Sequence, residues 1–344
     1  MKSFTVGPND AGQRLDRFLN KACPGLPSSL LQKALRRKNV KRNGRPAQPH
    51  ERVCPGDEVA VFLPDEVLKP AKDKPAHSPG NRAPFSLADG PLDIVYEDEA
   101  ILLVGKPAGL SVHEDETGSP DTLINRALRY LHGKGDWDPA RENGFAPALC
   151  HRLDRNTAGL VLIAKTAPAL RALCEKMRTR EIRRRYLCVV HGIPRPASGT
   201  LRHYLWKDER RHQAYIRPDR TGGAKTAVTR YRVLDTRGAL SLVRCELETG
   251  RTHQIRAQFA AIGHPLLGDG KYGRWQETRL EPPADTQTGR RGQALCSYHL
   301  SFTFPPDTET IGYLHGKTFT WPASLAELSE EAGRADAFWR LFET

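Results

Sequence analysis

The chain has 344 residues, of which 38% are hydrophobic and 27% are charged, so it can bury substantial cores and is not compositionally disordered as a whole. The length is about twice that of a typical domain, which predicts two domains and excludes a single small module. Its 53 Lys and Arg residues exceed its 40 Asp and Glu residues, and the formal net charge is +13. This excess makes nucleic acid the leading class of partner.

Neither a membrane span nor a disulfide framework is predicted. The longest wholly apolar run covers residues 158–164, far below the roughly 18 to 20 residues that cross a bilayer. The N-terminus lacks the apolar segment of a secretory signal, so we expect a cytoplasmic protein. The cysteines number seven, and no two are spaced as in a zinc site, which predicts reduced thiols.

Residues 1–63 are predicted to form a small module of helices and strands. Two helices follow from apolar residues at helical spacing, namely Leu15, Phe18 and Leu19, and then Leu31, Ala34 and Leu35 after Ser28 and Ser29. Asn43 and Gly44 mark a hairpin-like turn. The alternation of Val59, Val61 and Leu63 predicts a strand.

A basic segment begins on the polar face of the second helix. Residues 33–45 contain seven basic residues and no acidic one: Lys33, Arg36, Arg37, Lys38, Lys41, Arg42 and Arg45. Residues 1–60 carry 12 basic and 5 acidic residues, a net +7. A solvated helix face is the alternative, but like charges repel one another and a bound phosphate backbone would relieve that repulsion. We therefore predict that these seven residues bind RNA.

A proline-rich linker is predicted at residues 64–91, where six prolines occur without a hydrophobic period. We assign residues 92–320 to a large domain and 321–344 to a C-terminal helix. Apolar runs predict strands at 101–104, 160–164 and 186–190 and at Val243, Cys245 and Leu247, and apolar stripes predict helices around 124–131 and 170–177. Because strands and helices do not alternate regularly, we predict an α+β fold with a mixed or antiparallel sheet flanked by helices.

Three segments carry candidate chemistry. HRLDRNTAGL at 151–160 places Asp154 among arginines directly before a buried strand, although a structural acid satisfied by Arg152 or Arg155 is the simpler alternative. TGRTHQIR at 249–256 leads into a helix with Thr252 as the expected N-cap, which would turn Arg251 into a cleft. An exposed arginine in a helix-entry turn is the alternative.

The third segment is an arginine run followed by Tyr186 at the start of a strand: Arg178, Arg180, Arg183, Arg184 and Arg185. Cations beside an aromatic ring suit phosphate binding next to a platform for base stacking. An ordinary strand tyrosine is the usual alternative.

Together these segments resemble the RluA-type pseudouridine synthases. The resemblance covers about residues 92–305 and includes ILLVGKPAGLSVH at 101–113, RRRYLCVVHG at 183–192 and LCSYHLSFTFP at 295–305, in the family's order. Residues 12–63 resemble the RNA-binding module first known from small-subunit ribosomal protein S-four. The resemblance implies a pseudouridine synthase catalytic domain at 92–320 behind an RNA-binding module.

The resemblance also implies roles for individual residues. Asp154 would act on the ribose and detach uracil from C1′, by direct attack or by a glycal route. Arg251 would pair with Asp154, Tyr186 would stack on the uracil, and Arg152 would fill the gap left by the flipped nucleotide. The reaction is an isomerisation, and the sequence contains no GxGxxG, Walker or HExxH motif, so we expect no cofactor and no metal.

The predicted function is the isomerisation of uridines to pseudouridine in structured RNA, with large-subunit ribosomal RNA as the first substrate and transfer RNA as the alternative. A non-catalytic RNA-binding factor for ribosome assembly is a third hypothesis, which the intact Asp154, Tyr186 and Arg251 disfavour. We expect a monomer. The segments 131–146 and 274–293 read as loops without an assigned role.

Overall fold

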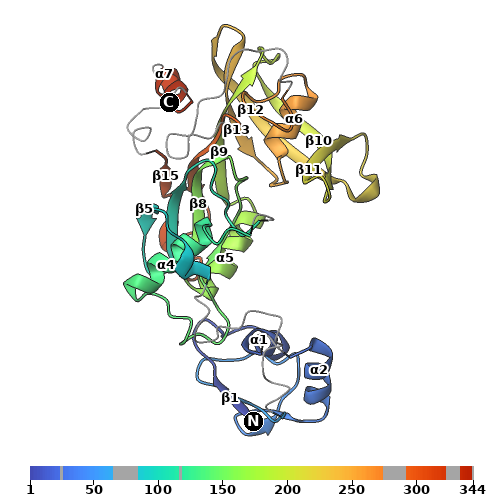
Figure 1. Ribbon diagram of the computed structural model, residues 1–344, viewed down its shortest axis with the longest axis vertical. Helices are drawn as coiled ribbons and strands as arrows, with labels where there is room; N and C mark the ends of the chain where they lie inside the picture. Colours follow the sequence, from blue (N-terminus) through green and yellow to red (C-terminus); the bar gives the residue numbers. More distant parts are fainter. Residues whose placement is uncertain (24–25, 65–83, 116–117, 274–291, 323–333, 343–344) are drawn as a thin grey trace.

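The computed structural model describes residues 1–23, 26–64, 84–115, 118–273, 292–322 and 334–342. The molecule is elongated, with a small N-terminal module at one end and a large sheet domain running to the other (Figure 1). Among the described residues, no helix is long and apolar enough to cross a membrane.

The N-terminal module is a four-stranded sheet covered by two helices. Its elements are β1 (Lys2–Thr5), α1 (Leu15–Ala22), α2 (Ser28–Arg36), β2 (Val40–Arg42), β3 (Arg45–Pro46) and β4 (Glu58–Val61), with the strands in the order β1-β4-β2-β3. The predicted apolar stripes of both helices are buried in one core with Val59 and Val61. Asn43 and Gly44 have φ values of 49° and 78°, as the predicted hairpin turn between β2 and β3 requires. The strand β4 ends at Val61, before Leu63.

The large domain is built on one mixed sheet of 11 strands. Nine of them follow the order β11-β10-β12-β13-β9-β14-β8-β6-β5, while β15 pairs with β14 and β7 with β8. Their bounds are β5 (Asp93–Glu97), β6 (Ile101–Lys106), β7 (Ala148–Leu149), β8 (Ala158–Ala164), β9 (Ile182–His191), β10 (Ser198–Asp208), β11 (Gln213–Arg217), β12 (Lys225–Arg237), β13 (Leu240–Leu247), β14 (Leu295–Phe302) and β15 (Thr318–Thr320). The β14 and β8 strands run parallel, and the other pairs among the described strands are antiparallel. The predicted α+β class with a mixed sheet is confirmed.

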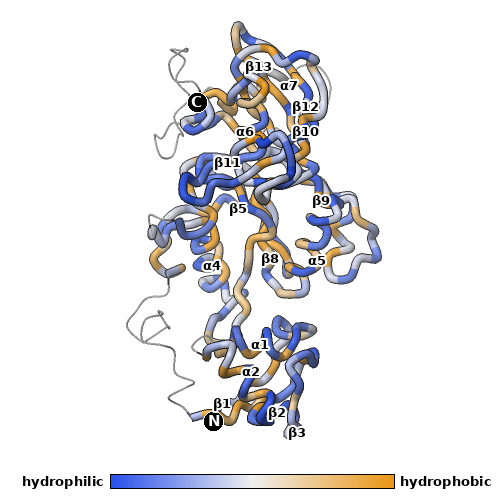
Figure 2. The backbone as a smooth tube through the Cα atoms, turned by 90° about the vertical axis from the view of Figure 1, so that its right-hand side faces the viewer, coloured by the Kyte–Doolittle hydropathy of each residue, from blue (hydrophilic) through white to orange (hydrophobic). Residues whose placement is uncertain are grey.

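Helices pack on both faces of this sheet. They are α4 (Leu123–Lys134), α5 (Ala167–Arg178), α6 (Gln254–Ala261) and α7 (Arg334–Arg340), with short 3-10 turns η1 (Pro84–Leu87), η2 (Thr221–Gly223) and η3 (Gly312–Leu314). Strand residues alternate between faces: Tyr186 and Cys188 join the core that contains α4 and α6, whereas Leu187 and Val189 join the core that contains α7. In Figure 2 the trace is strongly hydrophobic along β8 and mostly hydrophilic along β11.

The large domain begins before the predicted boundary at residue 92. The η1 turn lies inside the predicted linker, yet Phe85 is buried and its ring packs against Trp137 with centroids 5.4 Å apart. The described part of the linker therefore belongs to the large domain from residue 84 onward. The predicted C-terminal helix corresponds to α7, where Trp339 is buried, while Leu325 and Leu328 lie outside the described residues.

The two modules meet at the loop that precedes β7. Asn143 donates hydrogen bonds to the Thr5 carbonyl at 2.6 Å and to Asp10 at 2.8 Å, and Asn9 donates to Glu142 at 2.7 Å. The Asn9 side chain also accepts from the Ala167 N–H at the start of α5. The predicted loop 131–146 starts too early, because α4 extends to Lys134, but its end holds the N-terminal module. Most of the predicted loop 274–293 lies outside the described residues.

Candidate active site

Asp154 lies in the loop between β7 and β8, and a buried lysine fixes that loop. Lys106 is fully buried, and its Nζ donates to the carbonyls of Pro107, Leu110 and Arg155, each at 2.8 Å. An ammonium group has three protons to donate, so this lysine ties the chain after Asp154 to the end of β6. No role was predicted for Lys106, although a lysine at the end of an apolar strand is a signal of a buried ammonium group that needs acceptors.

A close packing of strands sets the direction in which this loop leaves the sheet. Gly159 has a φ of 119°, and a Cβ there would lie 2.3 Å from the Ser297 carbonyl oxygen, where β8 and β14 run side by side. Only glycine fits such an approach. The glycine in HRLDRNTAGL is thus required by the fold next to Asp154.

Two basic side chains approach one oxygen of the Asp154 carboxylate. Arg256 Nη1 donates to Oδ2 at 3.0 Å, and His253 Nε2 lies 3.8 Å from the same oxygen. The Asp154 side chain is 25% exposed, whereas that of Arg256 is 6% exposed. Within the described part of the chain, Oδ1 has no hydrogen-bond partner, so it is the oxygen available to a substrate.

A second, fully buried carboxylate holds Arg256. The Nε and Nη2 atoms of Arg256 donate to Asp269 Oδ2 and Oδ1, at 2.7 and 2.9 Å. Burial alone would raise the pKa of Asp269, but the Arg256 hydrogen bonds and charge, with the N–H groups of Lys271 and Tyr272, lower it overall. Burial alone would lower the pKa of Arg256, but Asp269 and Asp154 raise it. Arg256 is therefore a fixed cation between two carboxylates.

The predicted pairing of Arg251 with Asp154 is wrong. Arg251 is exposed, its Nε donates to the Thr226 carbonyl at 3.1 Å, and its N–H donates to Gln254. The reason is the start of α6: the N-cap is His253, with a left-handed φ of 52°, and not the predicted Thr252. The helix therefore begins at Gln254, and Arg256 in its first turn points to Asp154 and Asp269.

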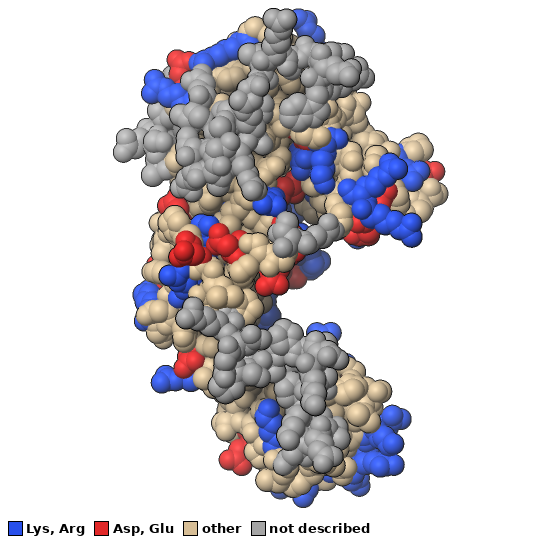
Figure 3. Space-filling model, viewed as in Figure 1, with Lys and Arg blue, Asp and Glu red and all other residues tan. Residues whose placement is uncertain are grey.

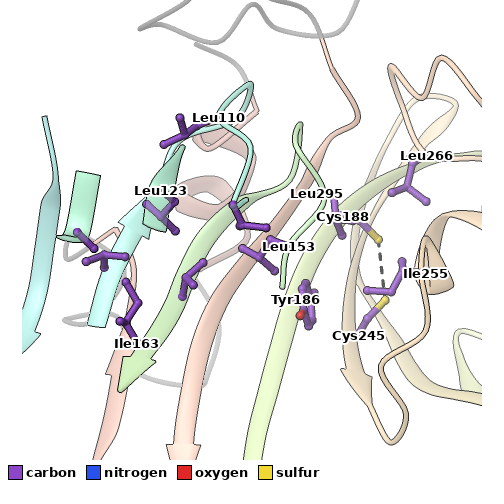
Figure 4. Packing of buried hydrophobic residues seen from close by; sticks show 14 of the residues in the cluster. Leu110, Leu123, Leu153, Ile163, Tyr186, Cys188, Cys245, Ile255, Leu266 and Leu295 are labelled. Carbon is purple, nitrogen blue, oxygen red and sulfur yellow. Dashed lines mark hydrogen bonds between the residues drawn. The ribbon is translucent and has the colours of Figure 1, made fainter. Parts of the chain in front are cut away.

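Tyr186 lies on the same face of the sheet as α6. It is 4% exposed, lies opposite Cys245 in the β9–β13 register, and belongs to the core that contains Leu153, the residue before Asp154. Figure 4 shows the Tyr186 ring next to Leu153 and Cys245. The Tyr186 ring is therefore packed in the core beside the Asp154 loop, and its stacking on a base stays a prediction.

Arg152 and the arginine run differ in how far their charges are already paired. Arg152 is exposed, with no hydrogen bond or ion pair to the described residues. Burial, followed by the charge of Arg152, lowers the pKa of His113, so the two side chains are neighbours. In the run, Arg178, Arg180 and Arg185 form ion pairs with Glu175, Glu248 and Glu246. Arg183 and Arg184 make no such pair within the described ranges.

The basic segment of the N-terminal module is exposed except for one internal pair. Lys33, Arg36, Arg37, Lys38 and Arg45 are exposed, and Lys41 is half-buried over the ring of Phe62. Arg42 instead donates to the buried Asp57 at 2.7 Å, so its charge is used within the module. Lys and Arg gather along the edge of the module where α2 lies in Figure 1, and over the β10–β11 hairpin (Figure 3).

Comparison with known proteins identifies the family. The family described as RNA pseudouridylate synthase matches residues 100–261, and the S4 domain matches residues 13–59. The chain is 35% identical over 318 residues to "Ribosomal large subunit pseudouridine synthase D" of Neisseria meningitidis, covering 90% of this chain and 77% of that protein. It is 37% identical over 273 residues to the Escherichia coli protein of the same name, covering 78% and 75%. It is 31% identical over 328 residues to "Uncharacterized RNA pseudouridine synthase YlyB" of Bacillus subtilis, covering 95% and 96%.

The fold, the Asp154 loop and these relatives define the class: the chain belongs to the RNA pseudouridine synthase family. Within that family it is an RluA-type synthase, an RNA-binding isomerase with an N-terminal S-four-type domain. The predicted resemblance and enzyme class are confirmed. Across the described ranges, no group of three His, Cys, Asp or Glu residues is placed to hold a metal ion.

Proposed function

We propose that this protein isomerises uridine to pseudouridine in large-subunit ribosomal RNA, as the names of its relatives state for them. The observation that carries the proposal is the asymmetric Asp154 carboxylate. Its Oδ2 is held by the buried Arg256, while Oδ1 is free of partners among the described residues. A charged oxygen with a fixed direction is what an attack on, or a proton abstraction from, a ribose requires.

The target uridine must leave its stack to reach this loop. Extrusion costs a few kcal/mol of unstacking, and the exposed Arg152 next to Asp154 is placed to occupy the vacated position. In the reaction the C1′–N1 bond breaks, the uracil turns over, a C1′–C5 bond forms, and the proton on C5 is lost while N1 gains one. Direct attack of Oδ1 on C1′ and a glycal route both place Asp154 at the ribose.

Tyr186 and Arg256 complete the proposed site. The Tyr186 ring supplies a face for the detached uracil, and its hydroxyl assists removal of the C5 proton. Arg256 replaces Arg251 as the residue that positions Asp154. The exposed basic residues of the N-terminal module bind phosphates and position the RNA without reading its sequence. We further propose a monomer in the cytoplasm.

The decisive experiment compares wild type with Asp154→Asn, which keeps the size of the side chain but removes its charge. We expect RNA binding to persist and tritium release from 5-tritiated uridine RNA to fall below detection. Multiple turnover by pure Asp154→Asn would overturn the proposal. Carbodiimide mapping of ribosomal and transfer RNA, from cells with and without the protein, separates the two candidate substrates.

A further inference from the structure

Two side chains near Asp154, His253 and Tyr272, have no role in the reaction proposed above. His253 caps α6 in a left-handed backbone conformation with φ of 52°, which is uncommon for a residue with a Cβ. This conformation brings Nε2 to 3.8 Å from Asp154 Oδ2 and Nδ1 to 3.0 Å from the Tyr272 hydroxyl. Backbone strain of this kind persists where the surrounding structure over-determines it.

Tyr272 is itself anchored to the neighbouring hairpin. Its hydroxyl accepts from the Ala214 N–H in β11 at 2.8 Å and donates to the Ala214 carbonyl oxygen at 3.1 Å. Its ring lies 5.2 Å from the guanidinium of Arg256, and its edge meets the His253 ring with centroids 5.7 Å apart. One tyrosine therefore contacts both groups that approach Asp154 Oδ2.

The charge of Asp154 indicates which nitrogen of His253 carries the hydrogen. Burial raises the pKa of Tyr272 to about 12, so its hydroxyl keeps its single proton. Burial lowers the pKa of His253 to about 4 despite the charge of Asp154, while Arg256 and Lys271 lower it further and Asp269 opposes them. The imidazole is therefore neutral at neutral pH. The Tyr272 hydroxyl has one proton and two acceptors within reach, the Ala214 carbonyl oxygen and His253 Nδ1. Because an anion favours the tautomer with the hydrogen on the imidazole nitrogen that faces it, Asp154 favours the hydrogen on Nε2, and the tyrosine then donates to Nδ1 instead of to Ala214.

We propose that His253 and Tyr272 are positioning residues for Asp154. Tyr272 orients His253. The Nε2–H of His253, together with Arg256, keeps Oδ2 of Asp154 occupied and Oδ1 turned toward the ribose. The separation of 3.8 Å exceeds that of a direct hydrogen bond, so His253 acts through its dipole or through one bridging water. This inference rests on the proposed role of Asp154.

The test uses the full chain and four variants. His253→Ala removes the dipole, His253→Gln returns an N–H close to the position of Nε2, and Tyr272→Phe keeps the ring over Arg256 but loses the hydroxyl. Tyr231→Phe is the matched control, because Tyr231 also packs its ring on α6, against Phe259, and donates its hydroxyl to a backbone carbonyl, that of Pro196.

Single-turnover tritium release and RNA affinity are measured for each variant, with urea unfolding as a check of folding. We expect the rate to fall about tenfold in His253→Ala and Tyr272→Phe, with affinity unchanged within about twofold, and to recover at least in part in His253→Gln. Tyr231→Phe lowers stability without changing the rate.

Rates near wild type in folded His253→Ala and Tyr272→Phe would overturn the inference, as would rate losses matched by Tyr231→Phe or by equal losses in affinity. If His253→Ala does not fold, the other two variants decide. Inactivity of Asp154→Asn, measured in parallel, keeps this outcome distinct from that of the proposed function, which fails only if that variant turns over.

Discussion

The two arginines of the TGRTHQIR segment give the sharpest prediction. Arg256→Lys replaces a planar fork by a point charge that cannot bind Asp269 through two nitrogens and Asp154 at the same time. We expect the lysine to remain with Asp269, whose side chain is fully buried and is costly to leave unpaired. The hydrogen bond to Asp154 Oδ2 at 3.0 Å is then lost.

The size of the effect follows from the kind of bond. A hydrogen bond between charged groups contributes about 1.5–3 kcal/mol, and each 1.36 kcal/mol in the barrier is tenfold in rate. If the bond acts fully in the transition state, Arg256→Lys should slow the reaction by roughly 10- to 150-fold. Arg251→Lys is the matched control, because Arg251 is exposed and its side chain bonds only the Thr226 carbonyl among the described residues, so we expect a change within about twofold.

Both variants should be assayed by single-turnover tritium release at saturating enzyme, with filter binding for affinity and urea unfolding to verify the fold. A larger rate loss in Arg251→Lys than in Arg256→Lys would refute the reasoning and restore the pairing that the sequence suggested. Equal, small losses would show that Asp154 needs no fixed partner.

Four further outcomes are expected. Tyr186→Phe keeps the stacking face but loses the hydroxyl, so uracil should still detach while free product forms far more slowly, and near-normal product yield would contradict this. Dialysis against EDTA should leave activity on a short, unstructured RNA intact, and specific rescue of a lost activity by one transition metal would contradict this. Alanine at Lys33, Arg36, Arg37 and Lys38 should flatten the slope of log affinity against log salt by about 3, since each phosphate contact contributes roughly 0.7–0.9, and an unchanged slope would show that α2 does not touch the RNA. Burial keeps the pKa of His253 at about 4 in the folded chain, so only the unfolded chain takes up that proton as pH falls from about 6.5. At about pH 5 this should cost about 2 kcal/mol of folding stability. Urea titrations of wild type and His253→Gln would measure the cost, and equal losses of stability in acid would contradict the assignment.

The resemblance assigned Arg251 as the partner of Asp154, whereas the structure pairs Arg256 with it. The two are five residues apart on either side of a helix start, so the face that each presents depends on where α6 begins. That start is set by His253 in a left-handed conformation, which local propensity does not favour and tertiary contacts impose.

Charge pairing over long separations was equally invisible in the sequence. Arg42 belongs to the predicted RNA-binding set, but the fold brings it to Asp57, with which it forms an ion pair. The strands β10 to β12 were missed because polar and charged residues interrupt their apolar alternation, as the mixed burial along β12 shows. Pattern reasoning is strongest where a strand is buried on both faces, as β6 and β8 are.

The docking of the N-terminal module on the loop before β7 has a consequence for the choice of substrate. Because Asn9, Asp10 and Asn143 tie that module to the sheet domain, the exposed cations of α2 stand at a set distance from Asp154. We therefore expect the enzyme to prefer an RNA whose own tertiary structure holds a row of phosphates and an extrudable uridine at the same spacing. We expect the folded shape of the RNA to decide whether it is a substrate. An RNA fragment that carries the uridine without the row of phosphates should bind more weakly, because it lacks the contacts with α2, even though its sequence is unchanged.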